Sequence, residues 1–261
     1  MDTARIAELL EPFLREPRAI PDSPRHSEPT PTKNSSCHSE PAKAGEEPAV
    51  LSSAQLQSIS TYIDILVRWN ARINLTAIRA PEDIVTRHFG ESLFAARHLF
   101  PVAAGGRAAL QGRVNGEKDP GALAPASVAD LGSGAGFPGL PIKLWAPHIS
   151  LTLIESNHKK TAFLREVTRA LTLTDVNIQN ARAETLPATT YDVVTLRAVE
   201  RFEAILPTAA ALVAPAGRLA LLISSAQQSQ AGSTLPNLVW SEPAPVPQSR
   251  SRILLVARRP H

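Results

Sequence analysis

The chain has 261 residues, and its 27 lysines and arginines against 24 aspartates and glutamates give a net charge of +3. With 43% hydrophobic residues, this composition is typical of a globular protein, and the length predicts one large domain or one domain with an appendage. A single cysteine, Cys37, excludes an internal disulfide framework and a zinc site of clustered cysteines, and we expect a cytoplasmic protein because no secretory signal or membrane span is evident.

The N-terminal part of the chain predicts helices on both sides of a spacer. Apolar residues at spacings of three and four predict an outlying helix in 1–14 and a longer amphipathic helix over 53–73. Segment 15–50 is rich in proline and poor in large apolar residues, so we expect it to be disordered.

The next boundaries follow from changes in composition. Pro81, with acids directly behind it, predicts the start of another helix, and we assign 51–100 to a helical cap. Segment 101–127 is rich in glycine and alanine and is predicted to be a linker. The remaining part, 128–261, then forms the main domain.

Strands and helices alternate through this main domain. The alternation predicts an α/β fold with a doubly wound, mostly parallel sheet, in which ligands bind at the carboxyl ends of the strands. The expected strands are 127–131, 149–155, 176–179, 191–196, 218–223 and 253–257, and the expected helices are 139–145, 159–171 and 203–213, with a turn at 215–217 before the fifth strand.

A glycine-rich loop follows the first expected strand and can be interpreted in two ways. Gly134, Gly136 and Gly139 match the G-x-G-x-x-G pattern of dinucleotide-binding proteins. Asp130 followed by Gly132, Gly134 and Gly136 matches the D-x-G-x-G-x-G pattern of S-adenosylmethionine enzymes. A carboxylate at this position would repel a pyrophosphate but suits the positive charges of S-adenosylmethionine, which favours the second interpretation.

Glu155 stands at the end of the second expected strand, 19 residues after Gly136. A carboxylate there can accept hydrogen bonds from ribose hydroxyls. This feature fits NAD as well as S-adenosylmethionine, so it predicts a nucleoside ligand without deciding between the two.

These motifs together resemble the ribosomal RNA small subunit methyltransferase G family, also called GidB. The resemblance covers about 51–100 and 128–258, with a weaker match at 4–14. It implies a class I methyltransferase (Rossmann-like) fold with an N-terminal helical cap, which transfers a methyl group from S-adenosylmethionine to N7 of a guanine in 16S rRNA. The motifs that carry it are Asp130-Leu-Gly-Ser-Gly-Ala-Gly-Phe-Pro-Gly139, Trp69-Asn70, Asn74-Leu75-Thr76, His88-x-x-x-Ser92, Phe163-Leu164-Arg165-Glu166 and Arg197-Ala198.

The resemblance also implies cofactor contacts after each of the first four strands, with Ala183 and Glu184 beside the adenine. Arg197, after the fourth strand, is our candidate catalytic residue and would act by positioning a cofactor carboxylate or an RNA phosphate. With the glycine loop included, the expected cofactor-binding residues are Asp130, Gly132, Gly134, Phe137, Glu155, Ser156, Asn157, Ala183, Glu184 and Arg197.

The proposed chemistry requires little from the protein, because guanine N7 already carries a lone pair and no proton has to leave the product. We therefore expect no general base and no metal, and we interpret His88 as a buried histidine with a hydrogen-bond partner. The cluster of Trp69, Asn70 and Asn74 is either a base-stacking surface or core packing with a helix end.

Two residues depart from the family pattern. Glu91 stands where the family usually has aspartate, and Ile223 stands where it tends to have lysine. These departures leave an inactive rRNA-binding relative open as an alternative, and the G-x-G-x-x-G match of the loop leaves an NAD-dependent small-molecule oxidoreductase open. The expected partner is 16S rRNA or the small ribosomal subunit, and we expect a monomer.

Overall fold

The computed structural model describes residues 1–15, 51–101, 125–186, 191–197 and 202–260. The expected spacer and linker therefore lie almost entirely outside the described residues. In the described part, eight strands form one sheet. The strands are β1 (Ser127–Leu131), β2 (Ser150–Ile154), β3 (Val176–Gln179), β4 (Tyr191–Arg197), β5 (Val213–Ser224), β6 (Val239–Trp240), β7 (Ala244–Pro245) and β8 (Arg252–Arg258).

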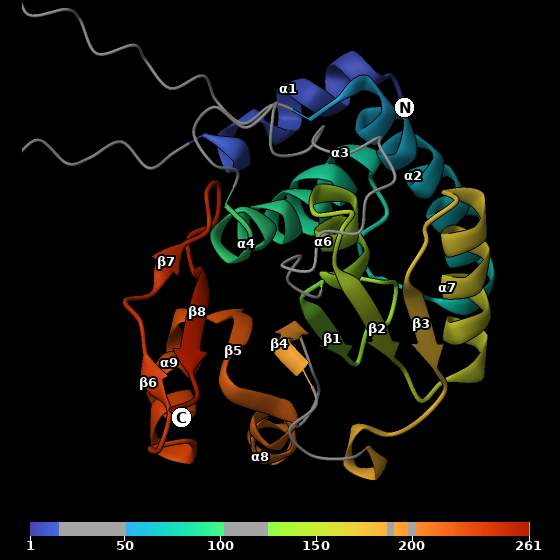
Figure 1. Cartoon of the computed structure of the whole chain (residues 1–261). Coiled ribbons are helices and arrows are strands. Elements are labelled where there is room, and N and C mark those ends of the chain that lie inside the picture. The colour runs from blue at the N-terminus through green and yellow to red at the C-terminus, as the bar shows by residue number, and fades with distance from the viewer. Residues whose placement is uncertain (16–50, 102–124, 187–190, 198–201, 261) are drawn as a thin grey trace, which may run out of the picture.

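The sheet is mostly parallel, as the alternation of elements predicted. Its strand order is β3-β2-β1-β4-β5-β8-β6, with β7 also paired to β8 (Figure 1). Strands β1 to β5 run parallel to their neighbours, whereas β8 runs antiparallel to β5, with Ser224 opposite Arg252. The carboxyl ends of the parallel strands and the start of β8 therefore share one edge of the sheet.

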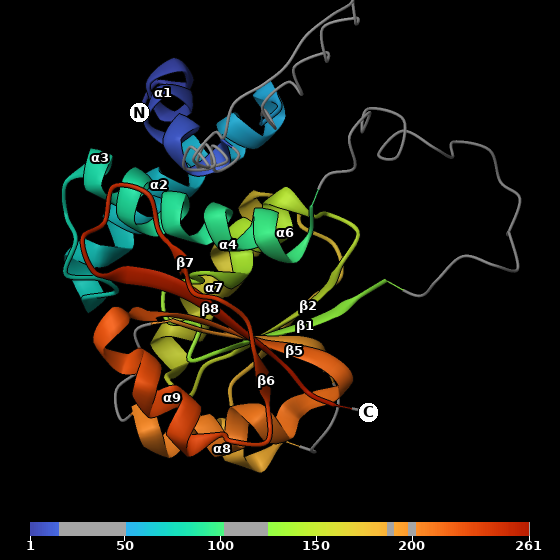
Figure 2. The ribbon, with the colours of Figure 1, turned by 90° about the vertical axis from the view of Figure 1, so that its left-hand side faces the viewer.

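Helices cover both faces of the sheet (Figure 2). One face carries α1 (Thr3–Leu14), α2 (Ser53–Ile73), the π-helix η1 (Ile84–Gly90), α4 (Glu91–Leu99), α6 (Gly139–Trp145) and α7 (His158–Ala170). The short helix α3 (Pro81–Asp83) leads into η1. The other face carries α8 (Phe202–Leu212) and α9 (Gln228–Thr234), with the 3₁₀ turns η2 (Ala183–Thr185) and η3 (Ser225–Gln227) nearby.

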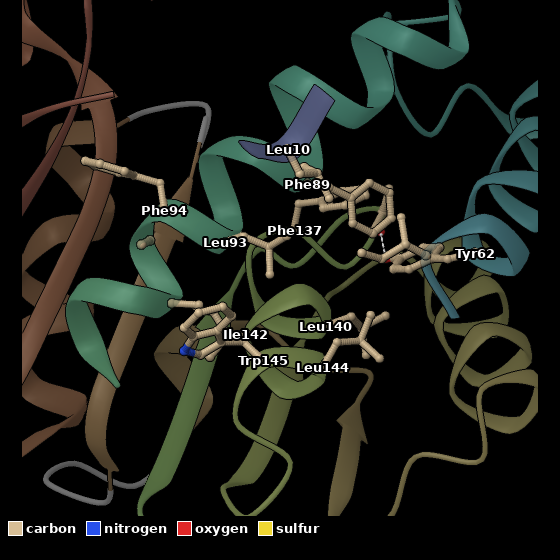
Figure 3. Packing of buried hydrophobic residues seen from close by; sticks show 14 of the residues in the cluster. Leu10, Tyr62, Phe89, Leu93, Phe94, Phe137, Leu140, Ile142, Leu144 and Trp145 are labelled. Atoms are coloured by element: carbon tan, nitrogen blue, oxygen red, sulfur yellow. Dashed lines mark hydrogen bonds between the residues drawn. The ribbon is translucent and has the colours of Figure 1, made fainter. Parts of the chain in front are cut away.

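The N-terminal helices belong to the same hydrophobic core as the sheet. One cluster of buried residues runs from Leu10 on α1 through Phe89 on η1 to Phe137 after the glycine loop (Figure 3). The two parts are in direct contact at Gly136, where an added Cβ atom would collide with the Tyr62 hydroxyl of α2. The expected division between cap and main domain therefore does not interrupt the core.

Local signals explain why the long helix begins and ends where it does. Ser52 caps α2 because its hydroxyl accepts a hydrogen bond from the Gln55 N–H, and the Gln55 side-chain oxygen accepts one from the Ser52 N–H. Asn74 ends the helix in the left-handed conformation, with φ of 46°. Ser52 and Asn74 directly flank the helix, so its observed bounds agree with the predicted range of 53–73.

One expected turn is wrong. Residues 215–217 lie inside β5, which begins at Val213, and the pairing with β4 shifts register between Tyr191 and Val193. Ala216 takes up the irregularity with φ of 61°. Pro215 indicated the end of a regular element, but β5 continues through it with a local irregularity in its pairing. Sequence reasoning also missed β6 and β7, because strands of two residues have no periodicity.

No helix in the described ranges is long and apolar enough to span a membrane.

Candidate active site

The glycine loop after β1 is built from residues in the left-handed region. The backbone φ angles of Gly132, Gly134 and Gly136 are 66°, 56° and 84°. Residues other than glycine adopt such angles only with strain. The loop is held to the neighbouring strand because the N–H groups of Gly132 and Ser133 both donate to the Ile154 carbonyl, at 2.9 and 3.1 Å.

Asp130, the last but one residue of β1, lies beneath this loop. Its side chain is fully buried and accepts hydrogen bonds from the Gly139 N–H at 3.2 Å and the Thr195 hydroxyl at 2.9 Å. Burial raises the pKa of the carboxyl to about 7, against the lowering effect of these hydrogen bonds. Asp130 thus supports the loop and acts on a ligand only through its charge.

The position of Asp130 bears on the two interpretations of the loop. In dinucleotide-binding proteins, the pyrophosphate lies at the N-terminus of the helix that follows the loop. Here the N–H of Gly139, the first residue of α6, is bonded to the Asp130 carboxylate. Because an added Cβ at Gly139 would lie 2.8 Å from that carboxylate, this glycine serves the close approach of Asp130. The geometry disfavours a pyrophosphate.

Glu155 directly follows β2 and connects its carboxylate to the loop. One oxygen accepts from the Gly134 N–H at 2.9 Å, and the other accepts from the Asn157 N–H at 2.8 Å. A carboxylate has about four acceptor positions, so two remain for ligand hydroxyls. Ser156 is exposed beside it, and the Asn157 side chain caps α7 through the N–H groups of residues 159 and 160.

Asn180 was missed by sequence reasoning, although it directly follows β3. Its side-chain amide donates to the carbonyls of Glu155 and Ser156, at 3.0 and 2.9 Å, and so holds the segment after β2. The signal was its place at a strand end, the same signal that identified Glu155. Ala183 and Glu184 follow on η2, where Ala183 is buried and Glu184 is exposed. No hydrogen bond between the described residues links this pair to the glycine loop.

Phe137 is enclosed in a stack of rings between the loop and the N-terminal helices. The Phe137 ring stacks on Tyr62, with centroids 5.4 Å apart, and on His88, with centroids 4.7 Å apart. Phe89 packs edge-on against it (Figure 3). The Tyr62 hydroxyl donates to the Ala135 carbonyl at 2.5 Å, so α2 is hydrogen-bonded to the loop on the side of the helical layer. Asp130 is bonded to the loop's end from the side of the sheet.

His88 has both ring nitrogens engaged. Its Nδ1 lies 2.9 Å from Nη1 of Arg197 and its Nε2 lies 2.8 Å from Oγ1 of Thr76. Because a guanidinium only donates, Nδ1 is the acceptor and Nε2 carries the proton. Burial, followed by the charges of Arg197, Arg87 and Arg252, lowers the pKa of His88 to about 3. The ring is therefore neutral and partnered, in agreement with the expected buried histidine.

The lowered pKa of His88 predicts an acid-sensitive contribution to stability. A depressed folded-state pKa contributes free energy that is complete above the unfolded pKa of 6.5 and is lost as the pH falls towards 3. Between pH 7 and about 4.5, the wild type should lose about 2–3 kcal/mol more than His88→Gln, which can keep both hydrogen bonds without titrating. Urea unfolding across this range measures the difference, and parallel curves would show that folding does not lower the pKa of His88.

Arg197, at the end of β4, is turned towards the helices and is almost wholly engaged. Its side chain is 8% exposed, pairs with Glu91 at 3.1 Å, and donates through Nη2 to the Arg87 carbonyl at 2.5 Å. Its guanidinium also lies 5.9 Å from the Phe137 ring centroid. Glu91 is 7% exposed and binds a second arginine, Arg252, at 3.4 Å. The glutamate thus ties together α4, β4 and β8.

The cluster at the end of α2 forms a helix end, as one of the two alternatives proposed. The Asn70 amide accepts from the Thr76 N–H and donates to the Thr76 carbonyl, which fixes the turn after the helix. Trp69 donates to Glu166 on α7 at 2.9 Å and packs edge-on against Phe163. Ile223, the second departure from the expected pattern, is 3% exposed within the core.

Comparisons with known proteins identify a matching family model, related chains and a similar fold. The family model for rRNA small subunit methyltransferase G (GidB) matches residues 55–103 and 119–238. A protein of that name from Xylella fastidiosa (strain 9a5c) is 34% identical over 76% of this chain and 84% of its own. One from Halorhodospira halophila (strain DSM 244 / SL1) is 38% identical over 66% of this chain and 71% of its own.

Among solved structures, magnesium protoporphyrin IX methyltransferase (ChlM) from Synechocystis PCC 6803, with bound SAM, has a similar fold. Its TM-score is 0.53 at 15% identity, and the match covers 77% of this chain and 97% of that one. This similarity confirms the predicted class I methyltransferase architecture. At that identity it bears on the fold alone.

Proposed function

This chain belongs to the rRNA small subunit methyltransferase G (GidB) family, and from this premise we propose that it methylates N7 of a guanine in 16S rRNA, with S-adenosylmethionine as the methyl donor. The observation that carries the proposal is the glycine loop with Asp130 buried beneath it and Glu155 beside it. None of the comparisons supports the NAD-dependent alternative.

The residues of the loop fit this cofactor. A Cβ added at Gly134 would meet only the Gly132 carbonyl oxygen, 3.7 Å away, so this side of the loop is open to a ligand. Glu155 keeps two acceptor positions, which suit the hydroxyls of a ribose. The charge of Asp130 lies behind the loop, where it favours a cationic ligand over a pyrophosphate. Ser156, Asn157, Ala183 and Glu184 follow strands whose carboxyl ends share this edge, and we assign them to the nucleoside half of the site.

When bound, S-adenosylmethionine supplies a methyl group on a positively charged sulfur, which the N7 lone pair attacks without any proton leaving. The protein then contributes orientation and the placement of charge. Glu91 and His88 hold the Arg197 guanidinium in one place. We assign Arg197 the role of positioning a cofactor carboxylate or an RNA phosphate. A neutral His88 without a free nitrogen has no role as a base in this scheme.

We further propose that the enzyme is a cytoplasmic monomer that acts on 16S rRNA or on the small ribosomal subunit. The test is transfer of labelled methyl groups to 16S rRNA and to assembled small subunits, with 23S rRNA as the control. N7-methylguanosine is then sought by aniline cleavage of the borohydride-reduced RNA. Label in another base, or in 23S rRNA alone, would contradict the proposal. Cofactor binding without transfer to either substrate would identify an inactive relative.

A further inference from the structure

Positive charge is in excess at the edge of the sheet next to the glycine loop. Three arginines gather around His88, and their charges all lower its pKa. They come from separate parts of the chain: Arg87 from η1, Arg197 from β4 and Arg252 from β8. Glu91 is the carboxylate that pairs with two of them. Asp130 also interacts with Arg197 from beneath the loop, so three positive charges face two carboxylates and at least one positive charge is in excess.

The three arginines differ in how much of the side chain is available. Arg197 is 8% exposed, and its N–H groups are occupied by Glu91, His88 and the Arg87 carbonyl. Arg252 is 26% exposed and is bound by Glu91 through Nη2 alone. Arg87 is exposed, and its side chain has no hydrogen bond or ion pair to another described residue. Arg87 and Arg252 therefore keep donors that can reach a ligand.

These two arginines lie on the side of the site away from the predicted nucleoside pocket. Apart from Arg197 at the end of β4, the expected cofactor residues lie on or follow β1, β2 and β3, which form one half of the sheet. Arg252 starts β8, beyond β4 and β5 in the other half, and Arg87 lies on the helical layer next to Arg197. A cofactor in the first half leaves this second half for the methyl acceptor.

We propose that Arg87 and Arg252 bind backbone phosphates of the RNA next to the guanosine that is methylated. This inference rests on the proposed function, because it assigns the acceptor side of the same site. Guanidinium groups bind phosphate oxygens through paired N–H donors, and such contacts orient a nucleic acid without reading its sequence. Glu91 engages only Nη2 of Arg252, so the other N–H groups of this guanidinium stay available for a phosphate.

The test is the salt dependence of RNA binding by Arg87→Gln and Arg252→Gln. Each phosphate contact contributes about 0.7–0.9 to the slope of log K against log salt concentration. Each variant should lose one such unit, which at 0.1 M salt corresponds to about five- to eightfold weaker binding of 16S rRNA. The affinity for S-adenosylmethionine should stay unchanged in both. The Arg87 side chain is exposed and makes no hydrogen bond or ion pair with another described residue, so Arg87→Gln should fold normally and its binding slope can be interpreted.

Arg258→Gln is the matched control, because Arg258 is an exposed arginine at the opposite end of the same strand β8. In the strand register Arg258 lies opposite Arg218, six residues from the β5 end where Arg252 lies opposite Ser224, and Arg258→Gln should leave the slope unchanged. Unaltered slopes in Arg87→Gln and Arg252→Gln would overturn the proposal. So would weaker cofactor binding with RNA binding intact, since the arginines would then hold the cofactor carboxylate. Because the slope is measured by binding, the result is independent of whether the wild type transfers methyl groups to this RNA.

Discussion

Gly134→Val should abolish the increase in melting temperature that S-adenosylmethionine gives the wild type. At about 100 times its dissociation constant, a ligand stabilises the folded state by about 2.7 kcal/mol, which corresponds to roughly 5–10 °C for a chain of this size. Valine at this position would extend into the open side of the loop and would have to adopt φ of 56°, which a β-branched residue strongly disfavours. Differential scanning fluorimetry with and without the cofactor measures the effect.

The variant should nevertheless fold, because a Cβ at Gly134 meets no other part of the protein closely. We expect the backbone strain to cost about 1–3 kcal/mol in the free protein. Gly232→Val is the matched control: Gly232 lies on α9, and an added Cβ there has nothing within 4 Å. Its cofactor-induced shift should equal that of the wild type. An unchanged affinity in Gly134→Val would refute the assignment of the loop to the cofactor.

Arg197→Ala should lower the single-turnover rate of methyl transfer about 100-fold, as the loss of positioning at a reacting centre can do. The replacement leaves the acceptor nitrogen of His88 without its donor and removes the closer of the two arginines on Glu91. Glu91 still pairs with Arg252 in this variant, so its charge is not left without a partner. We therefore expect the free energy of unfolding to fall by about 2–4 kcal/mol, less than for a buried ion pair that loses its only cation. Rates on small ribosomal subunits, measured with saturating cofactor, test the first effect.

A second arginine separates the two effects of that replacement. Arg218 on β5 also ties a strand to the helical layer, through a hydrogen bond to the Leu99 carbonyl at 3.0 Å and a position over the Phe100 ring. It lies at the opposite end of the sheet, so Arg218→Ala should cost stability and leave the rate per folded enzyme unchanged. Equal losses of rate in both variants would show that Arg197 is merely structural.

With cofactor at a concentration that saturates the enzyme even as Asp130 titrates near pH 7, the wild-type rate should also vary little between pH 6.5 and about 8.5. The acceptor needs no deprotonation, and the pKa of His88, about 3, leaves it neutral throughout this range. A steep slope that disappears in His88→Ala would make His88 a general base. That outcome would contradict both its hydrogen bonds and the proposed mechanism.

Much of the fold could be predicted because its signals are local. The bounds of α2, β1, α6 and β3 agree with the sequence pattern to the residue, since each depends on a cap, a turn or an alternation within a short window. The glycine loop and Glu155 could be identified for the same reason, as both stand directly after a strand. Asn180 stands in an equivalent place and could have been found by the same rule.

The contacts of Arg197 could not be predicted in this way. Its partners His88 and Glu91 are 109 and 106 residues away, and Glu91 reaches Arg252 across 161 residues. Only the three-dimensional packing shows that four charged or titratable groups form one network. The ring contacts of Phe137 could not be predicted either, because Tyr62 and His88 come from α2 and η1, far from Phe137 in the sequence.

The hydrogen bond from Tyr62 to Ala135 makes the helical layer and the glycine loop a linked pair. Thermodynamic linkage is reciprocal, so a ligand that orders the loop strengthens the seating of α2 by the same free energy that α2 contributes to ligand binding. A residue on α2 that never touches the cofactor therefore still affects its affinity. The cofactor site thus depends on a helix whose contact residue, Tyr62, lies 73 residues before Ala135 in the chain.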